Sequence, residues 1–229
     1  LYNELGAGER RMLHGEIAGL LEELYQGHIE GIAVQLARHY TEAGDDEKAV
    51  DYLLQAGDAA GRLYAHAEAR LHYTRALEAL DHLPDTVENR RQRVDILTQR
   101  IAWSWVADSP EKSLERLVEA ERIVGQLPGP DGMPGSDRVR LARIHYWMGR
   151  IHGARNALPE ALQHYSQVLP VAQEIGDAEL LGFPSNAMGQ MLMVQGRVAK
   201  SEPLFRQSMT ALEQTGHIGY WVQALANHG

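Results

Sequence analysis

The sequence predicts an all-α protein, an α-solenoid in which helical hairpins stack one after another. Residues that favour helices are abundant, whereas only two Phe are present and runs of β-branched residues are few. Small and large apolar residues recur at helical spacing with a repeat of roughly 34 to 40 residues. With 229 residues and 44% hydrophobic side chains, the chain can bury a substantial core. We expect essentially no sheet and roughly eleven helices in a right-handed superhelix.

The clearest copy of the repeat lies between Gly31 and Gly61. A tetratricopeptide unit consists of two antiparallel helices, with small residues where the helices approach closely and large residues between hairpins. A turn at residues 44–46 separates two such helices here. The matching positions are Leu36, Ala37 and Tyr40 on the first helix and Ala49, Leu53 and Ala56 on the second.

Two further copies follow in the second half, and a third begins near the last residue. The first spans Ala142 to Gly176, and the next repeats it forty residues later around Gly189. The same interval from Gly189 reaches Gly229, so we expect the fragment to end inside another repeat. The positions that match are His145, Met148, Gly149, His152, Ala161, Tyr165 and Val168, then Met188, Gly189, Leu192, Ser201, Phe205 and Ser208, then Trp221, Leu225 and Ala226.

Weaker copies connect these segments. Residues 67–80 have Ala69, Tyr73 and Ala76 at the spacing of a second helix. Residues Val94, Leu97, Ile101 and Trp105 form one apolar helical face. Ser109 and Pro110 resemble an N-cap followed by proline at the first helical position. Pro170 and Pro203 lie within or near predicted helices, and we expect them to bend or delay those helices.

The repeats suggest a domain organisation. Residues 1–28 are predicted to be a helical segment at the tail of a preceding domain, 29–127 a first array and 137–229 a second, truncated one. Residues 128–136 contain three Pro and three Gly, which no helix tolerates, so they are predicted to form a loop. A plain connector is the simpler interpretation of this loop, and a functional loop is the alternative. Both ends of the chain look cut, which indicates a piece of a longer polypeptide.

Composition argues against several classes of function. The formal net charge is −9, the pI is near 5.6, and Lys and Arg are mixed with acids, so no basic stripe for nucleic acid is predicted. The chain has no Cys, which removes disulfides, thiolate nucleophiles and Cys-ligated zinc. No apolar stretch approaches the roughly 18 residues of a membrane span. A cytoplasmic protein is the expectation.

The N-terminal part resembles a recurring passage in large bacterial signalling ATPases. The residues that carry this resemblance are 9–18, then 36–40, 43–45, 48–49 and 52–57. The family includes MalT-like activators of the LuxR type and ATPase-linked adenylate or guanylate cyclases, in which a nucleotide-binding module and a winged helix precede a tetratricopeptide-like superhelix. The resemblance is specific over about residues 9 to 80. It implies a sensor or interaction arm that receives an effector or partner and controls an ATPase or output domain.

The sequence offers little catalytic chemistry, and we predict neither enzyme activity nor a cofactor. It lacks both a phosphate-binding loop and a G-x-S-x-G nucleophile elbow, and the glycine-rich segment 125–135 has no Lys for a phosphate. His145 and His152 could share a helix face, but no carboxylate recurs there to complete a metal site. We interpret them as core or groove histidines. The paired acids at 22–23 and 45–46 are interpreted as solubilising or capping groups.

Binding through an extended concave surface is better supported, because stacked hairpins line such a surface with their first helices. Arg143 and Arg150 lie seven residues apart with Tyr146 between them and could clamp a carboxylate or phosphate. Ordinary solvated arginines with acidic partners in the repeat are the alternative. The predicted concave-face residues are Arg38, Thr41, Trp105, Arg143, Tyr146, Arg150, Asn186, Gln190 and Met193.

The small-residue patch at 56–61 contains Gly57 and Gly61 inside an otherwise strong helix. Glycine there costs about 1 kcal/mol relative to Ala, so something must offset that cost. Close packing of a neighbouring helix is the preferred explanation, and a peptide docked on exposed backbone is the alternative.

These observations predict a non-catalytic regulatory or sensor region of a larger signalling ATPase or transcriptional regulator. Its partner would be a protein, a peptide or a small-molecule effector bound on the concave surface. A self-association or scaffold module is the second hypothesis, and an enzyme built on a helical-repeat scaffold is a distant third.

Overall fold

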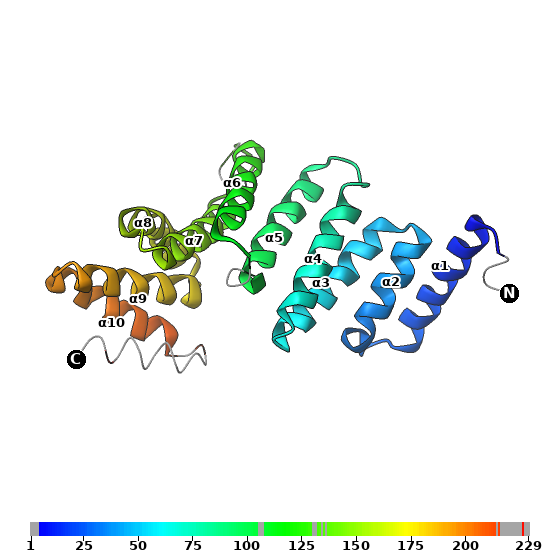
Figure 1. Cartoon of the computed structure of the whole chain (residues 1–229), viewed down its shortest axis with the longest axis horizontal. Coiled ribbons are helices and arrows are strands. Elements are labelled where there is room, and N and C mark those ends of the chain that lie inside the picture. Colours follow the sequence, from blue (N-terminus) through cyan, green and yellow to red (C-terminus); the bar gives the residue numbers. More distant parts are fainter. Residues whose placement is uncertain are drawn as a thin grey trace. The chain divides into compact units, whose positions relative to one another are not determined.

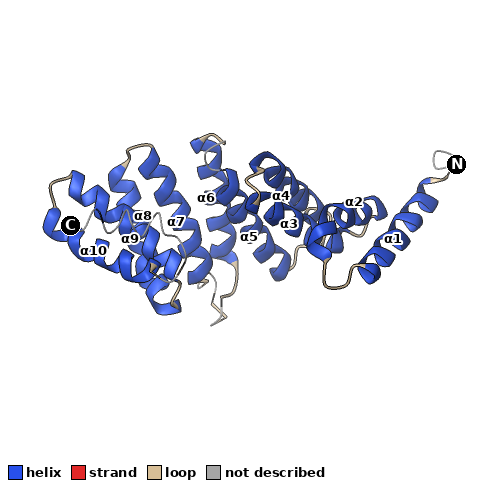
Figure 2. Cartoon of the chain, turned by 90° about the horizontal axis from the view of Figure 1, so that it is seen from below, coloured by secondary structure: helices blue, strands red, loops and turns tan. Residues whose placement is uncertain are grey.

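The computed structural model describes residues 5–104, 108–129, 132–133, 135, 137–213, 215 and 226. Every regular element in these ranges is a helix (Figure 2), which confirms the predicted all-α fold. The chain divides into two compact units, Leu1–Ser109 and Pro110–Gly229. Across the same described ranges, none of the helices combines the length and the apolar character needed to cross a bilayer.

The described residues of the first unit form five α-helices and one short 3₁₀ helix, and each α-helix packs against the next one along the chain (Figure 1). Its core is built from small and aromatic residues on the facing sides of these helices. The helices are α1 Ala7–Leu24, the 3₁₀ helix Ile29–Ile32, α2 Ala33–Ala43, α3 Asp46–Arg62, α4 His66–Leu80 and α5 Val87–Ser104.

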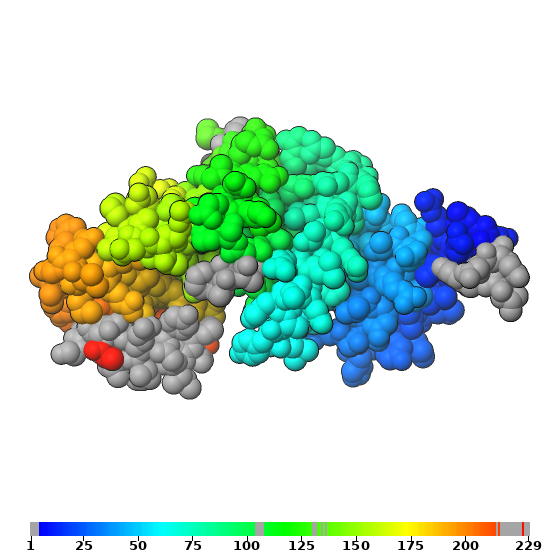
Figure 3. Space-filling model, viewed as in Figure 1, coloured from blue at the N-terminus to red at the C-terminus, as the bar shows by residue number. Residues whose placement is uncertain are grey.

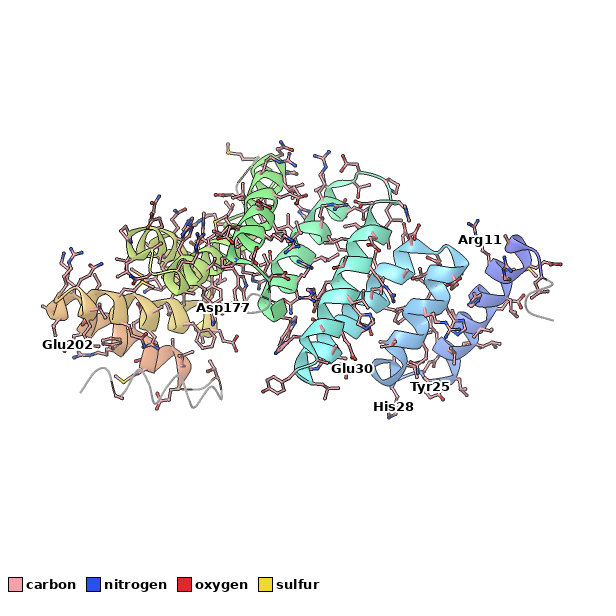
Figure 4. The ribbon with its side chains drawn as sticks, viewed as in Figure 1. Arg11, Tyr25, His28, Glu30, Asp177 and Glu202 are labelled. Atoms are coloured by element: carbon pink, nitrogen blue, oxygen red, sulfur yellow. The ribbon has the colours of Figure 1, made fainter. Side chains whose placement is uncertain are left out.

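The second unit contains five α-helices within its described residues, and they again pack in chain order. Asp177 caps the start of one of them (Figure 4), where its Oδ1 accepts a hydrogen bond from Leu180 N at 2.9 Å. The helices are α6 Pro110–Gln126, α7 Arg138–Ala154, α8 Leu158–Ile175, α9 Ala178–Val194 and α10 Val198–Leu212.

Several local expectations are confirmed. Helix α6 begins at Pro110, as the Ser-Pro pair predicts. Pro170 and Pro203 lie inside α8 and α10, as expected of their position, but neither delays its helix, and a bend at these residues stays a prediction. The helix predicted around Trp221 falls outside the described residues apart from Ala226, so the described chain contains ten of the roughly eleven predicted α-helices.

The Pro/Gly segment 128–136 connects α6 to α7 within the second unit. Gly135 N donates to Leu127 O, Gly129 N to Met133 O and Gly132 N to Gly129 O, each at 2.9 Å. The described part of this loop is therefore held by its own backbone hydrogen bonds. The division into arrays that meet at this loop remains a prediction, because compact units need not coincide with repeat boundaries.

One close contact recurs in both units. A glycine on one helix lies beneath an aromatic ring sixteen residues later on the next helix. A Cβ atom at Gly57 would lie 2.9 Å from the Tyr73 ring, and one at Gly149 would lie 2.6 Å from Tyr165. Gly189 has the same relation to Phe205, again at 2.6 Å. These distances are too short for any side chain, so only glycine permits this approach.

The small-residue patch of α3 is explained by the same packing. Gly57 contacts Tyr73 of α4, and a Cβ at Gly61 would lie 2.4 Å from the Trp103 indole of α5. Close helix packing, the preferred explanation for these glycines, is confirmed.

Helix α3 belongs to two hairpins. It packs against α2 as the second helix of the predicted unit between Gly31 and Gly61. It also packs against α4, whose Ala69, Tyr73 and Ala76 are buried as a second helix requires. The weaker copy predicted at 67–80 therefore has α3 as its first helix.

The turns of four hairpins contain one residue in the left-handed backbone region. In three of them it follows the close-packed glycine of the first helix by seven residues, and in the fourth Gly44 follows the buried Ala37 by the same interval. Three of the four are residues that tolerate positive φ, namely Gly44 at 78°, Asn156 at 60° and Gly196 at 72°. The fourth is Tyr64 at 60°, whose side chain is 82% exposed. Tyr64 therefore bears backbone strain with little burial in return.

Replacing Tyr64 by Asn is expected to stabilise the chain by about 0.5 to 1 kcal/mol, because Asn tolerates the left-handed conformation. Urea unfolding followed by circular dichroism measures the change. Leu63→Asn is the matched control, since Leu63 is 79% exposed and has a φ of −89°, where Asn relieves no strain. A loss of stability in Tyr64→Asn that exceeds the loss in the control would contradict the strain.

Gly149→Ala is expected to destabilise the second unit by about 1 to 3 kcal/mol, because the new methyl group overlaps the buried Tyr165 ring. Gly125→Ala is the control within the same unit. Gly125 is also helical, but a Cβ there meets nothing within 4 Å, so that variant gains about 0.5 kcal/mol from helix propensity. Equal unfolding midpoints for the two variants would rule out the close-packing account.

Candidate functional site

The first unit has a pocket of about 530 Å³ formed by α2, α3 and α4. Helices α2 and α4 both pack on α3, so their side chains border the pocket from two sides and α3 supplies part of its base. Figure 3 shows that these segments, coloured blue to cyan, reach the surface of the unit on the face drawn. The apolar part of the lining consists of Val34, Ala37, Leu53 and Ala79.

The turn between α2 and α3 lies at one end of the pocket. Gly44, in the left-handed region, ends α2, and its N–H donates to Thr41 O at 3.1 Å. Asp45 caps α3 by accepting a hydrogen bond from Lys48 N at 3.1 Å, which confirms the capping role predicted for it. Asp46 then begins α3 and lines the pocket, with its carboxylate 3.3 Å from His82 Nδ1 just beyond α4.

A polar cluster on α1, α2 and α3 fixes the relative position of these helices. Lys48 Nζ lies 2.8 Å from both Glu22 Oε2 and the Tyr40 hydroxyl, and the Tyr52 hydroxyl donates to Glu22 Oε1 at 2.5 Å. The rings of Tyr40 and Tyr52 stack with centroids 5.5 Å apart. Burial opposes ionisation of Glu22, but hydrogen bonds from Lys48, Tyr52 and Tyr40 outweigh it and lower its pKa. Glu22 is therefore a structural partner, and its interpretation as a solubilising group is wrong.

Two more contacts hold α3 in place. The Tyr73 hydroxyl of α4 donates to Asp58 of α3. Arg62, in the last turn of α3, pairs with Glu30 of the 3₁₀ helix at 2.9 Å (Figure 4). The helices that surround the pocket are thus connected by polar contacts as well as by the core.

The pocket contains charged side chains that have no ion-pair partner among the described residues. Arg38 and Glu42 lie on α2, and Arg75 and Glu78 lie on α4. All four residues are exposed, and among the described residues none has an oppositely charged group within ion-pair distance. Their charges are accordingly accessible to a bound molecule.

His72 of α4 also lines the pocket. Its Nδ1 is buried and has no hydrogen-bond partner within the described part of the chain. Burial lowers the pKa of His72, and the nearby charge of Arg75 lowers it further against the opposing effect of Glu68. His72 therefore favours its neutral form.

The predicted concave-face residues have different environments. Arg38 and Thr41 line the pocket, where the Thr41 hydroxyl donates to Ala37 O at 2.7 Å. Trp105 lies outside the described residues. On α9, Asn186 is only 4% exposed, whereas Gln190 is half-buried and Met193 is 39% exposed.

The arginine stripe predicted on α7 is partly engaged within the protein. Arg150 Nη1 donates to the Tyr146 hydroxyl at 2.9 Å, and its guanidinium lies 5.3 Å from the Trp147 ring centroid. Arg143 is exposed. The structure thus brings Tyr146 and Arg150 together, and a joint clamp with Arg143 remains a prediction.

Sequence reasoning missed the contribution of α4 to this site. His72, Arg75 and Ala79 recur at helical spacing on a side distinct from the buried Ala69 and Tyr73. That spacing is the signal from which a second face of α4 can be predicted. It does not indicate that α2 borders the same pocket.

Histidines form a compact cluster in the second unit. His145 and His164 have their Nδ1 atoms 3.0 Å apart, and the His152 ring stacks on His164 with centroids 5.4 Å apart. His145 is 7% exposed, as expected of a core or groove histidine. Within the described ranges, no three His, Cys, Asp or Glu side chains are grouped so that they could hold a metal ion.

No protein-family model matches this chain, and no curated protein matches it.

Acid is expected to destabilise the second unit through the histidine cluster. Burial, with help from His145 and His152, lowers the pKa of His164 from 6.5 to about 4. Burial also lowers the pKa of His145, although Glu121 opposes that effect. The unfolded chain therefore takes up protons first, so stability that is complete above pH 6.5 is lost as the pH falls toward 4.

Thermal unfolding measured between pH 7.5 and 4 tests this expectation. His164→Gln should make the fall in melting temperature shallower, whereas His28→Gln, an exposed control in the first unit, should leave the slope unchanged. Parallel pH profiles for the wild type and His164→Gln would exclude the cluster as the source.

Proposed function

We propose that this chain is a non-catalytic binding region of a larger cytoplasmic signalling ATPase or transcriptional regulator. A protein, peptide or small-molecule effector would occupy the pocket between α2 and α4. The observation that supports this most directly is the accessible pocket whose two arginines and two glutamates lack partners within the described chain. The resemblance of residues 9–80 to signalling ATPases covers the same helices.

The chemistry of the pocket favours recognition over catalysis. Its cations are arginines, which stay protonated and bind carboxylates or phosphates with directional hydrogen bonds. The carboxylates of Glu42 and Glu78 are exposed and can accept hydrogen bonds from a cation. Groups of this kind orient a ligand through a few polar contacts above an apolar base, as small-molecule sites do.

Self-association is the second candidate, and α1 provides the observation that favours it. Met12, Leu20 and Leu24 on this helix are 64%, 65% and 76% exposed. Exposed apolar side chains on one helix are typical of surfaces that a partner covers. Association through α1 would require no ligand.

Binding in the pocket is expected to raise the melting temperature of the chain, since a ligand at a hundred times its Kd stabilises by about 2.7 kcal/mol. Thermal denaturation with anionic, cationic and zwitterionic small molecules and short peptides measures this. The shift caused by an anionic or zwitterionic ligand should disappear in Arg38→Ala/Arg75→Ala and persist in Arg122→Ala, an exposed arginine on α6.

Sedimentation over a wide concentration range distinguishes the alternative. The proposal predicts a monomer with ligand-dependent stability. Dimerisation that Leu20→Glu abolishes, together with no stabilisation by any compound, would replace the proposal with self-association.

A further inference from the structure

The charges of the pocket are sorted by sign along its length. Helices α2 and α4 are each joined to α3 by a short turn and run antiparallel to it, so they run in the same direction as each other (Figures 1 and 2). On both helices the arginine precedes the glutamate, with Arg38 before Glu42 and Arg75 before Glu78. Asp46 begins α3 and lies at the end of the pocket where α2 and α4 finish. One end of the pocket is therefore cationic and the other anionic.

The order of charges on each helix explains why they remain unpaired. An acid that precedes a base by four residues forms a favourable pair on a helix, but the reverse order, as in Arg38 and Glu42, is less favourable. Arg75 and Glu78 have the same reversed order at a spacing of three. Neither pair closes within ion-pair distance in the described structure. A ligand does not have to break internal ion pairs in order to bind these four side chains.

The spacing of the charges limits the size of the ligand. Four residues of α-helix advance about 6 Å and three advance about 4.5 Å. The two charged ends of the pocket are therefore separated by about the length of one dipeptide. An extended dipeptide spans about 7 Å, whereas the ammonium and carboxylate of a single amino acid share one carbon. A pocket of about 530 Å³ accommodates a molecule of two or three residues. Its apolar lining at Val34, Leu53 and Ala79 suits apolar side chains.

We propose that this pocket binds short apolar peptides through both of their free termini. The peptide carboxylate lies between Arg38 and Arg75, and the peptide ammonium lies between Glu42 and Glu78, beyond which Asp46 is paired with His82. The inference rests on the proposed function, which it deepens by giving the effector a chemical class. Side chains of a docked protein segment can present the same two charges. The experiment distinguishes that source from free peptide termini.

Isothermal titration calorimetry with alanyl-leucine tests the proposal, with its N-acetylated and C-amidated forms as matched ligands. Binding is expected for the free dipeptide, and blocking either terminus should weaken it at least about tenfold, equivalent to about 1.4 kcal/mol.

Arg38→Gln/Arg75→Gln should reduce affinity for the free dipeptide by a similar factor but change affinity for the C-amidated form little. Glu42→Gln/Glu78→Gln should behave in the same way toward the N-acetylated form. Arg122→Gln and Glu119→Gln are exposed controls on α6.

An exchange variant provides a control of identical composition. Arg38→Glu combined with Glu42→Arg places the acid before the base on α2. This order favours an ion pair within the helix and reverses the order of the charges that α2 presents to the pocket. It should retain the helical circular dichroism of the wild type and lose binding of the free dipeptide.

The outcomes separate this inference from the proposed function. Equal affinity for the free dipeptide and for its N-acetylated and C-amidated forms, or unchanged binding in the exchange variant, overturns the inference. Saturable binding of an anion alone, lost in Arg38→Gln/Arg75→Gln, or of a cation alone, lost in Glu42→Gln/Glu78→Gln, also overturns it but leaves the pocket as a binding site. Binding of a terminally blocked longer peptide that either double variant abolishes has the same meaning. If nothing binds the pocket, both the inference and the proposed function fail.

Discussion

Contact between a helix backbone and an aromatic ring on the following helix determines the geometry of both units. At Gly57, Gly149 and Gly189 the absence of a side chain lets the ring of the next helix lie directly on the backbone. Tyr73, Tyr165 and Phe205, which supply these rings, are at most 2% exposed. Each contact removes a large apolar surface from water and sets the distance between two helices, so the helical propensity lost at glycine is offset by packing.

The pocket of the first unit follows from this packing. Helix α3 has small residues on more than one side and accepts α2, α4 and Trp103 of α5 as close neighbours. A helix that serves as second member of one hairpin and first member of the next has its two partners on either side. The side chains of α2 and α4 that do not contact α3 then border a common space. The pocket is a consequence of how one helix is shared.

Polar groups contribute differently inside and outside that pocket. Glu22, Lys48, Tyr40 and Tyr52 satisfy one another and hold three helices together. Arg38, Glu42, Arg75 and Glu78 are exposed and make no such contacts in the described chain. Satisfied polar clusters contribute to a defined structure, whereas accessible unpaired charges contribute little to stability and are more informative about binding.

The all-α fold, the hairpin turns and the close-packing role of Gly57 could be predicted from the sequence, because each depends on local spacing and on residue size. The same local information assigned Arg38 and Thr41 to a binding surface but missed other polar residues that line the pocket, among them Glu42, Asp46, His72, Arg75 and Glu78. Which helix serves two hairpins depends on contacts between neighbouring helices, such as that of Gly57 with Tyr73 sixteen residues later, and a repeat pattern does not specify them. Only the tertiary structure brought side chains of α2 and α4 to one pocket, showed that Glu22 is a structural partner, and sorted the charges of the pocket by sign. Those features require the positions of side chains in space, whereas the repeat requires only their order along a helix.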